Sequence, residues 1–167
     1  MLIKNYGLFW DLEEVDWGYK GPGGSGTLLG RYARKLRSEP VNFREQQGVY
    51  VLYDASFRII YVGQTGSGAG QRLFIRIRQH KRDHLAQRWS KFSWFGILPV
   101  VEGELDVDAQ PATPTVSGVL DHIEGILLAA AEPPLNLQRG RFGQDVEQYI
   151  QCPLDTGNEE DEEDEEE

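Results

Sequence analysis

Two short β-rich runs separated by a turn constrain the fold of this chain more than any other feature. The runs are Val-Tyr-Val-Leu-Tyr at 49–53 and Ile-Ile-Tyr-Val at 59–62, with Asp54-Ala55-Ser56 between them. β-Branched and aromatic residues favour extended backbone, whereas Asp and Ser favour turns. The pattern therefore predicts a β-hairpin that opens the core of the fold.

Apolar periodicity predicts the other elements. In the segment after the hairpin, Leu73, Phe74, Ile77 and Leu85 recur at the spacing of one helix face. An aromatic run that follows is typical of a strand. We expect helices over 27–36, 71–88, 118–131 and 144–151, and a third strand over 92–97.

These elements indicate an α+β fold, an α/β sandwich in which helices flank a small, mostly antiparallel sheet of about three strands. The core is expected over 48–142, after an N-terminal extension over 1–47 that packs on it. A C-terminal helix would lie within 143–154, and 99–117 would form a long connection. The acidic tail over 155–167 has too few apolar residues to bury, so we expect it to be disordered.

The cysteine content and the hydropathy favour an intracellular protein. Cys152 is the single cysteine, which excludes an internal disulfide and a cysteine-based zinc cluster. The sequence contains neither a run of about eighteen apolar residues nor the apolar stretch of a signal peptide. We therefore expect a soluble, cytoplasmic protein with no membrane partner.

The charge is divided unevenly between the body of the chain and its tail. The formal net charge is −10, but ten of the 27 carboxylates lie in 155–167, and the remaining 17 balance the 17 Lys and Arg. Within the body, 61–92 holds one carboxylate, Asp83, among seven cations. Such a local excess suits a phosphate backbone, although an ordinary solvated helix face has the same appearance. The cations are Arg72, Arg76, Arg78, Lys81, Arg82, Arg88 and Lys91.

A glycine-rich loop over 63–70 lies where the hairpin should pass into the first helix. Backbone N–H groups at such a transition can hold a phosphate. The residue after Gly68 is Ala69, where a nucleotide-triphosphate loop would have Lys. The loop is either a contact for a single phosphate, beginning at Gly63, or a flexible connection.

Two tripeptides and a run of residues downstream of them resemble the motifs of a known family. Gly48-Val49-Tyr50 is followed after ten residues by Tyr61-Val62-Gly63, and then by Arg76-Ile77-Arg78-Gln79-His80. The combination resembles the signature of the GIY-YIG nucleases, with valine in place of both isoleucines. The resemblance extends over 48–142.

The resemblance implies a magnesium- or manganese-dependent endonuclease that hydrolyses phosphodiester bonds of DNA. Tyr50 would activate the attacking water, and Tyr61 would position water or phosphate. Arg76 would neutralise the developing charge, and Glu124 would hold the metal ion. Asn136, after the helix of Glu124, would support the site.

Two roles stay open at this stage. In the family, the arginine usually lies about ten residues after the second tyrosine. Arg72 keeps roughly this spacing from Tyr61, whereas Arg76 fits if the glycine-rich loop is an insertion, and we favour Arg76. His80 is either an alternative base or an ordinary histidine of the helix surface.

The environment of Glu124 is also predicted from periodicity. Leu120, Ile123, Leu127 and Ala130 form an apolar stripe that should draw Glu124 towards the buried side. A buried carboxylate is costly unless it binds a cation or pairs with an arginine. Both a Mg²⁺ ligand and a core ion pair fit this pattern.

The sequence thus predicts a DNA nuclease that serves DNA repair, restriction or antiviral (phage) defence. The alternative is a catalytically inactive module that binds nucleic acid or protein, with the acidic tail acting as a DNA mimic. A protein partner would bind through the tail or the extension over 1–47. The expected nucleic-acid contacts are Gly63, Arg72, Arg76, Arg78 and Lys81.

Overall fold

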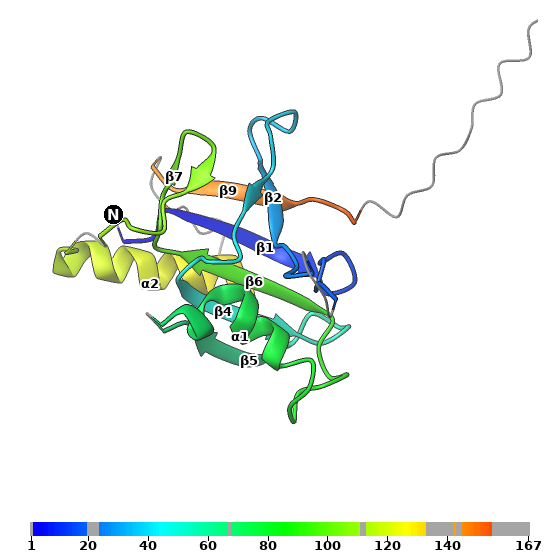
Figure 1. Cartoon of the computed structure of the whole chain (residues 1–167). Coiled ribbons are helices and arrows are strands. Elements are labelled where there is room, and N and C mark those ends of the chain that lie inside the picture. The colour runs from blue at the N-terminus through cyan, green and yellow to red at the C-terminus, as the bar shows by residue number, and fades with distance from the viewer. Residues whose placement is uncertain are drawn as a thin grey trace, which may run out of the picture.

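A computed structural model shows a single large sheet with one described helix on each of its faces (Figure 1). The sheet has seven strands in the order β3-β2-β9-β1-β6-β4-β5. All neighbouring strands are antiparallel except β1 and β9, which are parallel. The structure describes residues 2–19, 24–66, 68–110, 113–132, 142 and 145–154.

The element bounds are as follows. The strands of the large sheet are β1 (Asn5–Asp11), β2 (Leu29–Tyr32), β3 (Val41–Asn42), β4 (Gly48–Tyr53), β5 (Ile59–Gln64), β6 (Lys91–Gly96) and β9 (Glu147–Gln151). A separate two-stranded sheet consists of β7 (Val100–Val101) and β8 (Glu104–Leu105). The helices are the 3₁₀ turn η1 (Ala69–Gln71), α1 (Leu73–Gln79) and α2 (Val116–Ala131).

The predicted hairpin and third strand are confirmed, and the α+β class with a mostly antiparallel sheet is confirmed with them. They form β5, β4 and β6, which lie together at one edge of the sheet. The expected size of about three strands is wrong, because four further strands continue the sheet beyond β6. Three of these come from the segment expected as an extension packed on the core, so that segment is part of the sheet itself.

Two predicted helices are strands. Residues 27–36 contain β2, and the described part of 144–151 contains β9. β9 lies between β2 and β1 and forms backbone pairs with both. Tertiary pairing of this kind outweighs a weak local preference for helix.

The other two predicted helices are present with altered lengths. α2 confirms the helix expected over 118–131. α1 ends at Gln79, well before the expected end at 88, and His80 caps it. The chain then turns, since the Asp83 carboxylate accepts from the N–H of Leu85 and draws the backbone into a loop. The expected connection over 99–117 contains the β7–β8 pair.

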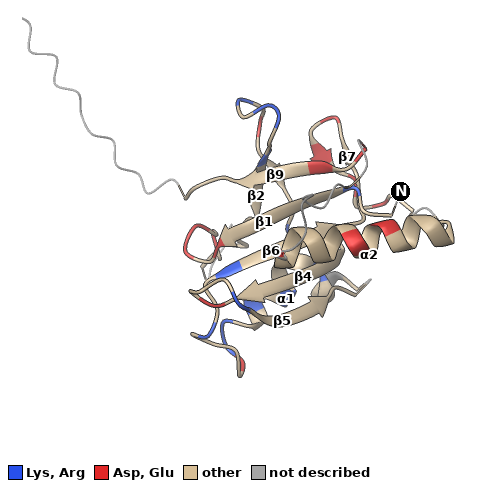
Figure 2. Cartoon of the chain, turned by 180° about the vertical axis from the view of Figure 1, so that it is seen from behind, with Lys and Arg blue, Asp and Glu red and all other residues tan. Residues whose placement is uncertain are grey.

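Alternate side chains of β4 point to opposite faces of the sheet, so they pack in two separate core clusters, one on the side of α1 and one on the side of α2. Tyr50 and Leu52 face the side of α1, where they belong to an aromatic-rich cluster with Phe74 and Ile77. Val51 and its neighbour Tyr53 face α2 in a second cluster. Figures 1 and 2, which view the sheet from opposite sides, show α1 on one face and α2 on the other.

No helix in the described ranges is long and apolar enough to cross a membrane.

Candidate functional site

The centre of the candidate site is a hydrogen-bonded chain of three side chains. The Tyr50 hydroxyl lies 2.8 Å from Nε2 of His80, and Nδ1 of His80 lies 2.7 Å from a carboxylate oxygen of Asp83. Tyr50 comes from β4, and His80 from the end of α1. Both are buried, whereas Asp83 is partly exposed.

The chemistry of these groups sets the direction of the hydrogen bonds. An ionised carboxylate can only accept, so Nδ1 of a neutral His80 donates to Asp83. Nε2 is then the acceptor for the Tyr50 O–H. The arrangement can take a proton from the tyrosine side and hold the resulting imidazolium against Asp83.

Tyr61 and Arg76 complete the cluster. The Tyr61 ring lies 4.6 Å from the His80 ring and 6.1 Å from the Tyr50 ring, measured between centroids. The Arg76 guanidinium interacts with the Tyr50 hydroxyl and donates to the side-chain oxygen of Gln79 at 3.1 Å. Because Tyr61 and Arg76 are partly exposed, they are the members that solvent or a ligand reaches first.

Gly63 lets the two tyrosines meet. It is the cross-strand partner of Tyr50 and shares a sheet face with Tyr61. A Cβ at Gly63 would lie 2.4 Å from the Tyr50 hydroxyl oxygen and 2.8 Å from a ring carbon of Tyr61. The absence of a side chain is therefore a packing requirement of the site.

The electrostatics of Tyr50 do not favour its ionised form. Burial, reinforced by the neighbouring Tyr61, raises the pKa of Tyr50 to about 12, although Arg76 acts in the opposite direction. The sequence prediction that Tyr50 acts as a base required a lowered pKa. At neutral pH Tyr50 instead keeps its proton and can pass it on to His80.

Asp83 favours the ionised form that its hydrogen bond with His80 requires. Partial burial acts to raise its pKa, but hydrogen bonds from the Leu85 N–H and from His80 hold the pKa below its ordinary value. Sequence reasoning missed this residue. Its signal was the i, i+3 spacing from His80 and its position as the single carboxylate in a basic segment.

The structure distinguishes the two candidate arginines. Arg76 lies beside Tyr50, whereas Arg72 precedes α1, and its buried Nη1 has no hydrogen-bond partner. Of the other expected nucleic-acid contacts, Gly63 lies on β5, and Arg78 and Lys81 belong to the α1 region. Arg78 lies over the Phe74 ring, and Lys81 lies over the Trp17 ring.

Glu124 does not join this cluster. It is exposed on α2, and α2 packs through Ala129 and Ala130 against the face of the sheet opposite Tyr50. The prediction that Glu124 is drawn towards the buried side is therefore wrong. Three of the four residues of the expected apolar stripe, Leu120, Ile123 and Leu127, are exposed, and Ala130 alone of the four is buried. Asn136 lies outside the described residues.

The residue expected to hold the metal ion, Glu124, stands apart from this cluster. The described residues contain no group of three or more His, Cys, Asp or Glu side chains that could hold a metal. The carboxylate of the cluster, Asp83, already accepts from His80 and Leu85 through its two oxygens. Glu124 lies across the sheet, so it cannot share an ion with a phosphate held by Arg76.

Comparisons with protein-family models, with curated proteins and with solved structures found no match to this chain.

Proposed function

We propose that this chain is a phosphodiesterase that cleaves nucleic acid at the cluster of Tyr50, Tyr61, Arg76, His80 and Asp83. The observation that carries the proposal is the hydrogen-bonded chain from Tyr50 through His80 to Asp83 beside a guanidinium. Phosphodiester hydrolysis needs an acceptor for the proton of water and a positive group for the phosphoryl oxygens. The cluster supplies both.

In the proposed reaction, Arg76 binds the phosphate, and Tyr61 contacts the attacking water. The water oxygen forms a bond to phosphorus, and its proton passes to the oxygen of Tyr61. The Tyr61 hydroxyl, which interacts with that of Tyr50, passes its own proton to the Tyr50 oxygen, and Tyr50 passes its proton to Nε2 of His80, which becomes protonated. The bond from phosphorus to the leaving sugar oxygen breaks, and that oxygen takes a proton from solvent.

This role for Tyr50 is compatible with its high pKa. A hydroxyl that accepts one proton while it releases another never has to exist as a free phenolate. His80, held by Asp83, is then the base. The family resemblance assigned that role to Tyr50 and kept His80 as the alternative, and the geometry supports the alternative.

The decisive experiment compares Tyr50→Phe, His80→Gln and Arg76→Ala with Glu124→Ala as the matched control. Plasmid, single-stranded and branched DNA, and RNA of the same sequences, are incubated with and without Mg²⁺. We expect the first three variants to cleave about 10²- to 10⁴-fold more slowly. Glu124→Ala should keep wild-type activity, since its side chain lies across the sheet. Loss of activity in Glu124→Ala alone would refute the proposed proton transfer through Tyr50 to His80.

A second candidate function is a nucleic-acid-binding module without catalysis. The full burial of Tyr50 and the remote position of Glu124 favour it. It predicts that the wild-type chain binds the same substrates and cleaves none of them under any condition of the assay.

A further inference from the structure

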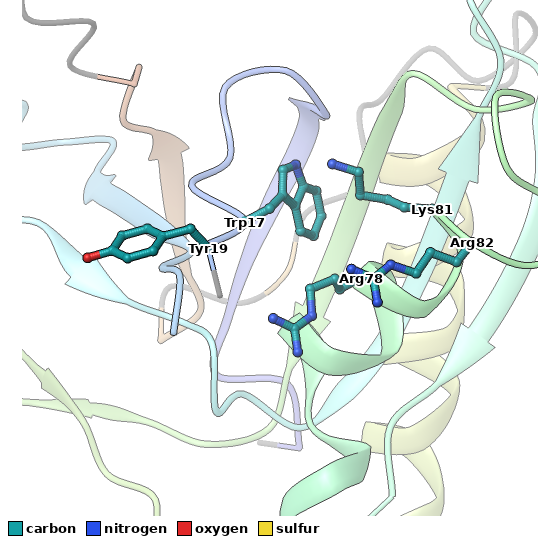
Figure 3. A pocket seen from close by; sticks show the side chains of 6 residues that line it. Trp17, Tyr19, Arg78, Lys81 and Arg82 are labelled. Carbon is teal, nitrogen blue, oxygen red and sulfur yellow. The ribbon is translucent and has the colours of Figure 1, made fainter. Parts of the chain in front are cut away.

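A hollow with an aromatic and a basic side lies next to α1. Its volume is about 510 Å³, and it is lined by Trp17, Gly18 and Tyr19 on one side and by Arg78, Lys81 and Arg82 on the other. Figure 3 shows the Lys81 side chain reaching towards the Trp17 ring, with the side chains of Arg78 and Arg82 alongside. Hollows of this volume are typical of sites for small ligands.

Trp17 is held firmly at the floor of this hollow. Its indole N–H donates to the carbonyl oxygen of Leu12 at 2.9 Å, and its ring packs against Phe74 and Trp89 at centroid distances of 5.5 and 6.4 Å. Lys81 Nζ lies 4.5 Å from the ring centroid. A ring fixed in this way loses little conformational freedom when a ligand stacks beside it.

Tyr19 is presented by a constrained turn. Gly18 has a φ of +73°, and a Cβ there would lie 2.0 Å from the carbonyl oxygen of Gly24. The Tyr19 N–H donates to the same carbonyl at 3.0 Å. The turn directs the Tyr19 ring outwards, where 70% of its surface is exposed.

The three cations have no carboxylate partner in the described part of the chain. The four ion pairs found there involve other basic residues. Burial, partly offset by the attraction of Glu13, lowers the pKa of Lys81. The hollow therefore combines positive charge with the partly buried ring of Trp17 and the exposed ring of Tyr19.

A second hollow lies on the side of the proposed catalytic cluster. It has a volume of about 520 Å³, shares Arg78 and Arg82 with the first, and adds Ile75, Gln79 and Asp83. Gln79 accepts a hydrogen bond from Arg76, and Asp83 is bonded to His80. The two hollows share Arg78 and Arg82, and we refer to them together as the groove.

We propose that this groove binds single-stranded nucleic acid, with an unpaired base stacked on the exposed ring of Tyr19 and the phosphates on Arg78, Lys81 and Arg82. Aromatic side chains stack on unpaired bases, whereas the bases of a duplex are covered by their neighbours. The groove therefore selects single strands, or the unpaired part of a branched molecule. The direction of the strand towards the cluster rests on the proposed function, but the binding itself does not.

The test measures binding of fluorescently labelled oligo-dT, oligo-U and a duplex of equal length by the full chain carrying Tyr50→Phe, so that cleavage does not interfere. In this background, Tyr19→Ala should weaken single-strand binding about 5- to 150-fold, the range for loss of one stacked base. Tyr19→Phe, which keeps the ring, should restore it. Arg82→Ala should lower the slope of log K against log salt concentration by about 0.7.

Arg37→Ala is the matched control, because Arg37 is an exposed arginine on the β2–β3 connection. It should leave both affinity and salt slope unchanged. The proposal fails if the duplex binds as tightly as the single strands, or if Tyr19→Ala and Arg82→Ala bind like the control. Selective binding by this variant, together with a wild-type chain that cleaves none of the substrates, would refute the proposed function alone. Cleavage that is indifferent to Tyr19 and Arg82 would refute the groove alone.

Discussion

At the scale of single residues, the contact between Tyr50 and His80 depends on what surrounds it. Tyr50 is fully buried, so its hydroxyl must find a partner inside the protein, and His80 provides it. Asp83 then fixes the orientation of the imidazole. The three residues act as a unit, and a change at a neighbour that shifts one of them should affect all three.

Gly63 is such a neighbour. Gly63→Ala should displace the Tyr50 hydroxyl, because the new Cβ would lie 2.4 Å from it. We expect cleavage to fall about 10²-fold, as for loss of one acid–base group. Gly68→Ala is the control, since a Cβ there meets no atom within 4 Å. Equal cleavage rates for the two variants would contradict the prediction.

Asp83 should make stability depend on pH in the acid range. Its pKa in the folded chain is held below the ordinary value of 3.8, so its contribution is present above that value and is lost as the pH falls through the folded pKa. The melting temperatures of wild type and Asp83→Asn should therefore differ near neutral pH and converge in acid. Thermal unfolding over that range measures this. A difference in melting temperature that stays constant over this pH range would contradict the lowered pKa of Asp83.

At the scale of elements, α2 packs through its small residues. Gly125, Ala129 and Ala130 face the sheet, and the Tyr53 hydroxyl donates to the Ala130 carbonyl at 2.8 Å. Small side chains let the helix backbone come this close. The larger apolar residues Leu120, Ile123 and Leu127 are left on the outside.

Two identical substitutions test this orientation. Leu52 is fully buried in β4, whereas Leu127 on α2 is 59% exposed. Leu52→Ala should cost about 2–5 kcal/mol of unfolding free energy, and Leu127→Ala should stay within about 0.5 kcal/mol of wild type. Denaturant unfolding gives both values. A comparable loss in Leu127→Ala would mean that the stripe on α2 is covered.

β9 joins two parts of the sheet. It pairs with β1 on one side and β2 on the other, and Tyr149 accepts a hydrogen bond from the indole of Trp10 through its carbonyl oxygen. A chain that ends at Val146 should therefore fail to unfold cooperatively. A chain that ends at Leu154 should melt like wild type. Circular dichroism on heating distinguishes them, and a sharp transition in the shorter chain would disprove the role of β9.

At the scale of the whole molecule, charge is the organising property. The ten carboxylates of 155–167 account for the formal net charge of −10, whereas the α1 region is locally basic. We hypothesise that the tail competes with nucleic acid for these cations. Such competition between exposed charges weakens with added salt.

Removing residues 155–167 should therefore tighten nonspecific DNA binding, most strongly at low salt. The control keeps the length of the tail but replaces its Asp and Glu with Asn and Gln, and it should behave like the truncation. Electrophoretic mobility shifts at two salt concentrations measure the effect. Unchanged affinity at low salt would rule the hypothesis out.

The sequence by itself determined the local parts of this protein. The hairpin of β4 and β5, the third strand β6, the helix α2 and the grouping of Tyr50, Tyr61, Arg76 and His80 all follow from patterns within one contiguous stretch. Periodicity and turn chemistry act over a few residues, so the elements that depend on them can be predicted from the sequence alone.

The tertiary structure decided what depends on distant partners. β2 and β9 became strands because each found a pairing edge, and Asp83 gained its role because α1 ends early enough for the following turn to bring it to His80. Which face of α2 is buried, and so where Glu124 lies, was set by how closely the helix approaches the sheet. Trp17 met the cations of α1 only through folding, because contacts far apart in sequence leave no local pattern to read.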